Sequence, residues 1–187
     1  MSRIISRQVL EGQLLVKSSA SVAKRIGVDV ESLIEDMNAA LAKVKAAAKA
    51  VESDAVSADD AFDYVQANVF DTVDDIRSIA DSIRALTNVR QFANQTAADI
   101  KRFEKKILKL QKSGESVEDA TALLEKLRAD FTAFRPLAAK RLTQDTVDSV
   151  VASIQVLSDD SDQLKEELGM NSTDTLIQRL QSLVPGR

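Results

Sequence analysis

Residues 61–86 read AFDYVQANVFDTVDDIRSIADSIRAL and decide the fold class of this 187-residue chain. Large apolar residues recur here in steps of three and four, at Phe62, Val65, Val69, Val73, Ile76, Ile79, Ile83 and Leu86. This spacing places them on one face of an α-helix and turns the intervening acids outward. The stretch therefore predicts an amphipathic helix that buries one apolar stripe.

The same stepping continues beyond this stretch, at Val89, Ala93, Thr96, Ile100, Phe103, Ile107 and Leu110, and ends at Ser113-Gly114. The pattern slips once, across Thr87-Asn88, where two three-residue steps adjoin. Such a slip either breaks a helix or locally overwinds a continuous one. Because neither Gly nor Pro occurs at the slip, we expect one long helix that is continuous or kinked.

Residues that favour helix ends divide the rest of the chain. Gly27 and Gly114 stand where periodic stretches stop, as expected of glycine after a helix. Asp29 and Ser57 are placed to cap the helices that follow them, and Ser116 is placed to cap a helix after Gly114. These signals predict a first helix, a second helix over residues 29–51, and the long helix.

The C-terminal part contains three further boundaries. Pro136 lacks an amide proton and should end or kink its helix near residues 134–135. Thr143 or Asp145 starts the next helix, which Gly169 stops. A short last helix is expected at residues 176–184, capped by Ser172 or Thr173 and ended by Pro185-Gly186.

Taken together, these elements predict an all-α protein of six or seven amphipathic helices in antiparallel hairpins. No alternating β-branched run lies between turn signals, so strands are not expected. The helices could form two tandem three-helix bundles. We expect a first helical unit at residues 1–87, a second at 88–171, and a short C-terminal helix and tail at 172–187. The pattern is typical of three-helix and coiled-coil bundles and contains no motif of a named family.

Charge follows the same two-part division. Residues 1–50 hold eight bases and five acids, and residues 51–87 hold two bases and nine acids. Residues 88–114 hold seven bases and two acids, and residues 143–169 hold one base and seven acids. This recurrence suggests an internal repeat in which oppositely charged helices lie side by side and help to set helix order. Unrelated amphipathic helices also align tolerably, so both duplication and coincidence stay open.

Composition excludes several kinds of chemistry. The chain has no Cys, no His and no Trp. Imidazole acid–base catalysis, His-ligated metals, thiol nucleophiles, disulfides and iron–sulfur clusters are therefore excluded. Carboxylate, Lys and Ser chemistry stays possible, but no G-x-S-x-G, S-x-x-K or P-loop pattern occurs. We expect a protein that is not an enzyme and has no catalytic residue, cofactor or metal.

Two kinds of charged cluster are candidate binding sites. Acids with helical spacing could attract Ca²⁺ or Mg²⁺, but the EF-hand pattern is absent and a solvated helix face explains them better. These acids are Asp59, Asp60, Asp63, Asp71, Asp74, Asp75, Asp159, Asp160 and Asp162. The bases that could contact an anion or a partner are Lys101, Arg102, Lys105, Lys106, Lys109 and Lys112. The net charge of −4 and the lack of aromatic residues for stacking argue against nucleic acid.

Two sets of uncharged residues are also candidate contacts. The small residues of Ala39-Ala40, Ala42 and Ala46-Ala47-Ala48 could form an oligomer seam, although a tight internal helix contact explains them better. The six phenylalanines are predicted to be core anchors: Phe62, Phe70, Phe92, Phe103, Phe131 and Phe134.

The predicted function is that of a noncatalytic structural or protein-interaction module that acts through helix-face packing. The alternatives are a filament or shell subunit, and a weak binder of anionic polymer or lipid through residues 101–112. A protein partner or self-association is expected. No apolar run is long enough for membrane insertion. The first residues lack a signal-peptide pattern, which favours the cytoplasm by default, although a secreted protein with its signal removed is the alternative.

Overall fold

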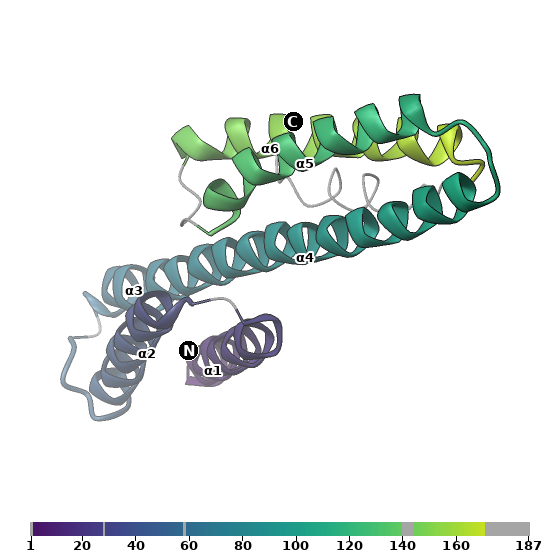
Figure 1. The fold of residues 1–187 in the computed structure, drawn as a ribbon. Helices are drawn as coiled ribbons and strands as arrows, with labels where there is room; N and C mark the ends of the chain where they lie inside the picture. Colours follow the sequence, from purple (N-terminus) through teal and green to yellow (C-terminus); the bar gives the residue numbers. More distant parts are fainter. Residues whose placement is uncertain (1, 28, 58, 140–143, 171–187) are drawn as a thin grey trace. The chain divides into compact units, whose positions relative to one another are not determined.

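The computed structural model describes residues 2–27, 29–57, 59–139 and 144–170, and within these ranges the chain forms helices and no strand (Figure 1). The all-α prediction is confirmed. The helices are α1 (Ser2–Ile26), α2 (Glu31–Glu52), α3 (Ala61–Val65), the π-helix η1 (Gln66–Phe70), α4 (Asp71–Lys112), α5 (Glu118–Ala138) and α6 (Gln144–Glu167).

The number of helices differs from the prediction of six or seven. Since α3, η1 and α4 follow one another without a gap, the described residues contain five continuous helical segments. Helix α4 runs through Thr87-Asn88 without a break, as the absence of Gly and Pro predicted. The helix expected at residues 176–184 lies outside the described residues.

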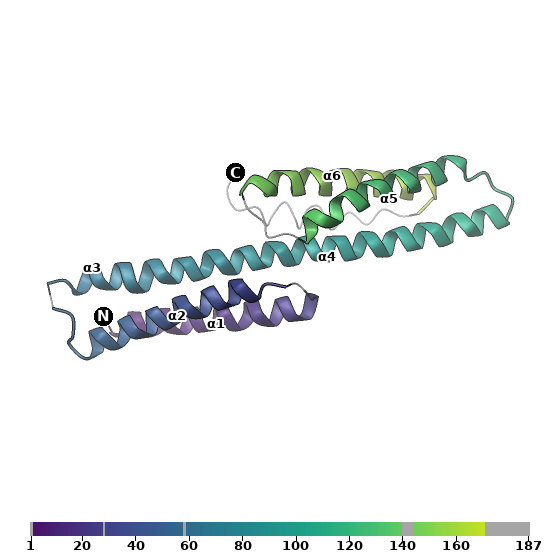
Figure 2. The same ribbon diagram turned by 60° about the vertical axis from the view of Figure 1, so that its left-hand side comes forward.

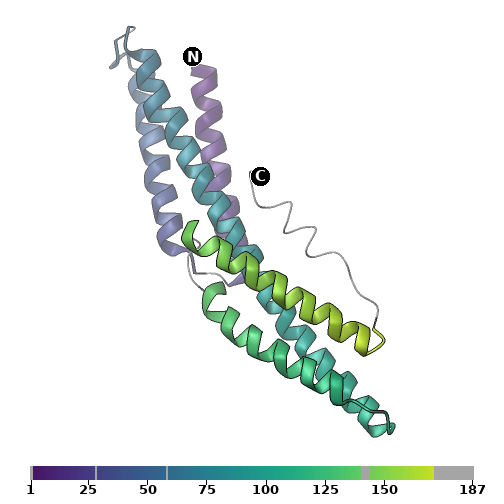
Figure 3. The ribbon, with the colours of Figure 1, turned by 90° about the horizontal axis from the view of Figure 1, so that it is seen from above.

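The chain divides into two compact units, one ending at Thr87 and the other beginning at Asn88. In the first unit α1 lies beside α2 (Figure 2), and η1 contacts both of them. In the second unit α5 lies beside α6 (Figure 3), and both pack with the part of α4 that follows Thr87. Helix α4 therefore contributes to both units, and each unit has its own core.

The core of the first unit is aliphatic. Its side chains come from one stripe on each helix, and full burial of one such side chain contributes about 1.5–3 kcal/mol. The largest side chains that are almost completely buried are Ile5, Met37, Val44, Val69, Val73, Ile76 and Ile83.

The core of the second unit contains the aromatic residues that are buried. Phe92 and Phe134 meet edge to face, with ring centroids 5.8 Å apart and an interplanar angle of 88°. This geometry places the positive edge of one ring against the negative face of the other. Phe103 is also buried, so three of the six phenylalanines are core anchors as predicted. Phe70 and Phe131 are partly buried.

Phe62 is 69% exposed, so its prediction as a core residue is wrong. It lies in the first turn of α3, where the helix begins and few neighbours surround it. The π turn that follows was not predicted. In an α-helix the two successive four-residue steps Val65–Val69–Val73 would rotate the apolar stripe by about 80°. The wider π turn, in which the Asp71 amide donates to the Gln66 carbonyl, absorbs this rotation.

Three helices end in the same hydrogen-bonded motif. A residue with positive φ follows each helix, and the next amide donates to the carbonyl five residues back. These residues are Asp54 (φ 53°), Gly114 (φ 81°) and Gly169 (φ 60°). The amides donate from Ala55 to Ala50 at 2.9 Å, from Glu115 to Leu110 at 3.1 Å, and from Met170 to Lys165 at 2.8 Å. The predicted stops at Gly114 and Gly169 are confirmed.

The predicted caps were less accurate. The Asp29 Oδ1 accepts from the Glu31 amide at 3.3 Å, but Val30 occupies the N-cap position of α2. The Ser57 Oγ accepts from the Asp60 amide at 3.2 Å, just before α3. Ser116 does not cap α5, because Val117 occupies the N-cap position without a side-chain hydrogen bond.

Pro136 does not end its helix near residues 134–135, because α5 continues to Ala138. A proline removes only one helical hydrogen bond directly, the one that its own amide would donate. Burial of Ala138 and packing of Leu137 against the core offset that loss. Of the two predicted starts for α6, Thr143 lies outside the described residues, and the helix begins at Gln144.

Gly12 marks a close approach of three helices in the first unit. It is buried in the middle of α1, and a Cβ atom built on it would lie 3.1 Å from the Leu41 Cδ1 of α2. The same atom would lie 3.5 Å from the Ile76 Cδ1 of α4. Glycine inside a helix costs about 1 kcal/mol relative to alanine. Its presence here is explained by the small space between three helices.

Replacing Gly12 with leucine should force these helices apart. We expect Gly12→Leu to lower the free energy of unfolding by about 1–3 kcal/mol through overpacking. Gly12→Ala should stay within about 1 kcal/mol of the parent, because better helix propensity offsets the tight contact with Leu41. Urea unfolding followed by circular dichroism measures both. Gln13→Leu adds a similar side chain at an exposed position of α1 and is the matched control. Unchanged stability of Gly12→Leu would contradict the close approach.

Candidate functional site

The six predicted bases all lie on α4, on the side away from the core. Lys106 is partly buried and the other five are exposed, whereas Ile100, Phe103 and Ile107 are buried. Leu108 is also exposed among these bases. We call Lys101, Arg102, Lys105, Leu108, Lys109 and Lys112 the basic face of α4. In the described part of the chain none of the six bases has an ion pair, and binding of an anionic polymer or lipid here stays a prediction.

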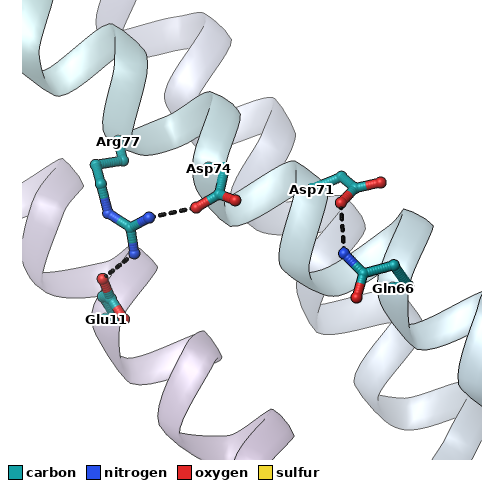
Figure 4. Close-up of polar contacts among 5 residues, drawn as sticks. All are labelled: Glu11, Gln66, Asp71, Asp74 and Arg77. Carbon is teal, nitrogen blue, oxygen red and sulfur yellow. Dashed lines mark hydrogen bonds and ion pairs between the residues drawn. The ribbon is translucent and has the colours of Figure 1, made fainter. Parts of the chain in front are cut away.

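The acidic clusters do not converge on a metal site. Within the described ranges no group of three or more acids is arranged to hold a metal ion. Several of these acids instead accept hydrogen bonds from neighbouring side chains. Figure 4 shows Asp71 accepting from the Gln66 Nε2 at 2.8 Å, and Asp74 accepting from Arg77.

One ion pair joins α1 to α4 within the first unit (Figure 4). Arg77 reaches the Glu11 Oε1 at 2.5 Å and also contacts Asp74 on its own helix. The hydrogen bond that Arg77 donates to Glu11 raises the pKa of Arg77. The charge pattern predicts a base on α1 paired with an acid in residues 51–87. The observed pair is the opposite, because Glu11 is the acid on α1 and Arg77 is the base in residues 51–87. Both side chains are exposed at least in part, so this pair contributes about 0–1 kcal/mol.

Asp160 was predicted to lie on a solvated face and is instead buried between α5 and α6. Its side chain is 9% exposed, and its Oδ1 accepts from the Lys126 Nζ. Lys126 also lies 3.4 Å from the Asp130 Oδ2. Among the residues that the structure describes, the Asp160 Oδ2 has no hydrogen-bond partner. Burial raises the pKa of Asp160, and Lys126 opposes this by stabilising the carboxylate. Contact with Asp160 raises the pKa of Lys126.

This buried carboxylate makes stability depend on pH in a defined direction. Because the folded pKa of Asp160 lies above its unfolded value, its ionisation costs more in the folded state. Its contribution to stability is therefore lost as pH rises from the unfolded pKa to the folded pKa.

Lys126→Met should destabilise the second unit mainly at neutral pH. Without the ammonium group, the buried Asp160 carboxylate is unpaired, which should cost about 1–3 kcal/mol at pH 7. The loss should shrink at pH 4, where Asp160 is protonated more readily. Urea unfolding at the two pH values measures the difference. Asp160→Asn in the same background should abolish the extra loss, and an equal loss at both pH values would contradict this role of Lys126.

The outer side of α1 carries a surface that sequence reasoning missed. Arg3, Arg7, Leu10, Leu14, Lys17 and Lys24 are all exposed and are spaced by helical steps on the side opposite Ile5 and Gly12. We call this set the basic face of α1. Leu10 is 55% exposed and Leu14 is 58% exposed, one turn apart among bases. In the sequence, this surface is indicated by the spacing of Leu10 and Leu14, which places them outside the helical stripe that contains Ile5 and Gly12.

The outer side of α6 has the opposite charge. Its exposed and partly exposed residues are Asp148, Val151, Ala152, Gln155, Val156, Asp159, Asp162 and Glu166, and we call this set the acidic face of α6. Val151 and Val156 are among the most exposed large apolar residues of the described chain. The Gln155 Nε2 donates to the Asp159 Oδ1 at 2.8 Å, which holds that carboxylate on the face.

Comparison of the chain with protein-family models, with curated proteins and with solved structures finds no match. Among the helices that the structure describes, none combines the length and apolar character needed to cross a membrane. The described surfaces that could contact a partner are a basic face on each unit, an acidic face on α6, and exposed apolar side chains among the charges.

Proposed function

We propose that this chain is a noncatalytic helical module that binds another protein through an outer helix face. The observation that supports it is the exposed pair Leu10 and Leu14 on the basic face of α1. Single exposed leucines are ordinary on protein surfaces. Two of them one helical turn apart, flanked by bases on both sides, form an apolar anchor with a charged rim, which is the usual anatomy of an interface.

The mechanism is burial of the apolar anchor with charges that orient the partner. Covering the exposed part of each leucine contributes about 2 kcal/mol, at about 25 cal/mol per Å² of apolar surface. Arg3, Arg7 and Lys17 would attract an acidic partner and disfavour a basic one. The internal stripe of α1 is occupied by its own unit, so the partner must use the outer side.

We also propose that each unit is an antiparallel three-helix bundle and that the two stand in tandem. Contacts of α1 with α2 and of α5 with α6 support the hairpins. The separate cores on either side of Thr87 support two units. A rigid bundle would present its outer faces with little loss of conformational entropy on binding.

Photo-crosslinking from position 14 tests the proposed function. A chain with a benzophenone amino acid in place of Leu14, irradiated in an extract of its source organism, should give discrete protein adducts of higher mass. Leu10→Ser in the same chain should reduce the adducts about tenfold, since a loss of about 1.4 kcal/mol in binding is a tenfold change in affinity.

The matched control places the same probe at Ala42, an exposed residue on the outer side of α2. This control should give no discrete adduct. Adducts from position 42 but not from position 14 would contradict the proposal and favour the alanine-rich face of α2 as the interface. A lack of adducts from both positions would also contradict it.

A further inference from the structure

We infer that the partner of the basic face of α1 is the acidic face of α6 in a second copy of this chain. The inference rests on the proposed function, because it names the occupant of the same surface. It makes the protein a self-assembling subunit in which the first unit of one copy binds the second unit of the next.

Charge complementarity is the first observation that supports this pairing. Residues 2–26, which form α1, hold five bases and one acid, and residues 144–167, which form α6, hold seven acids and one base. Opposite charges across an interface speed encounter and suppress wrong partners. The chain therefore carries both halves of an electrostatically matched pair.

The apolar residues of the two faces also match in position. Leu10 and Leu14 form one ridge along α1, and on α6 the row Asp148–Ala152–Val156 runs beside the row Val151–Gln155–Asp159. A ridge of this kind packs into the groove between two rows of side chains on a facing helix. Ala152 has the smallest side chain on these two rows, which permits close approach.

On each face, charged residues lie at similar distances to either side of the exposed apolar pair. Arg7 and Lys17 stand about five residues to either side of the leucine pair, or about 8 Å along the axis at 1.5 Å per residue. On α6, Asp148 and Asp159 stand about five to six residues to either side of the valine pair. Contact of the apolar centres therefore places a base opposite an acid at both ends, in either relative helix direction.

The basic face of α4 matches less well. It carries a single exposed large apolar residue, Leu108, where α1 carries a pair. The basic face of α4 is as positively charged and as exposed as the basic face of α1. If any basic helix attracted the acidic face of α6, changes to either basic face would weaken association equally. The basic face of α4 therefore provides the control for the test.

The pairing joins two different surfaces, so it is heterologous. Such contacts close into rings when the rotation between copies permits and otherwise grow into open filaments. The mass should therefore rise with concentration beyond that of a dimer.

Charge exchange between the two faces tests the inference. The α1 variant is Arg3→Glu/Arg7→Glu/Lys17→Glu, and the α6 variant is Asp148→Lys/Asp159→Lys/Glu166→Lys. The mass of the full chain is measured by sedimentation velocity from about 1 to about 200 μM, where a contact with micromolar Kd becomes populated. Each variant should weaken association at least tenfold, and the chain that carries both should recover it, because the charges are again complementary.

The control is Lys101→Glu/Lys105→Glu/Lys112→Glu, which changes net charge as much as the α1 variant does and should leave association unchanged. Circular dichroism must show that every variant is folded, and Leu10→Ser/Leu14→Ser gives a second disruption of the α1 face without charge change.

Failure of the combined variant to associate, or equal loss in the α4 control, would overturn the inference. A wild-type chain that stays monomeric throughout would also overturn it, including one that binds phosphatidylserine vesicles instead. If that monomer still forms adducts from position 14 with other proteins, the proposed function stands while the inference fails. If it forms none, both fail.

Discussion

Burial of one narrow aliphatic stripe on each helix is the constraint on which the rest of the structure depends. With aromatic residues at 4% of the chain, large rings cannot fill wide spaces between helices, so the helices must approach closely. Gly12 shows this most directly, because a single added methyl group would lie 3.1 Å from Leu41. The π turn in residues 66–70 serves the same constraint, since it keeps Val65 and Val73 on one stripe. Narrow buried stripes leave broad outer faces, and those faces carry the charges.

Charge has a smaller part in holding the fold than the segregated sequence suggested. The pair between Arg77 and Glu11 has the polarity opposite to that of its two helices and lies at the surface. At Asp160 burial raises the pKa in spite of the contact with Lys126, so the ionised carboxylate is held at a cost. Separation of basic from acidic helices thus contributes little to the described helix contacts. The separation of charge does give the outer faces of α1 and α6 opposite signs, as the proposed association between copies requires.

The three- and four-residue periodicity was sufficient to predict the class of fold and the positions of the main helices. Gly114 and Gly169 were identifiable because positive φ after a helix favours glycine. Other features depend on contacts that a linear pattern does not contain. Phe62 fits the pattern yet lies where the helix begins, and Asp160 fits an acidic surface yet lies between α5 and α6. The basic residues 101–112 were recognised by their density, whereas Leu10 and Leu14 become conspicuous only when the internal side of α1 is known.

Aliphatic burial holds the fold, whereas the exposed charges contribute little to its stability. The most direct test is the free energy of unfolding, from urea titration of dilute protein, at low salt and in 1 M NaCl. At 1 M ionic strength the Debye length is about 3 Å, so interactions between exposed charges are largely screened. The free energy of unfolding should change by less than about 1 kcal/mol, in keeping with the small contribution of exposed ion pairs. A loss of several kcal/mol in high salt would contradict the dominance of aliphatic burial and show that the separated charges hold the helices together.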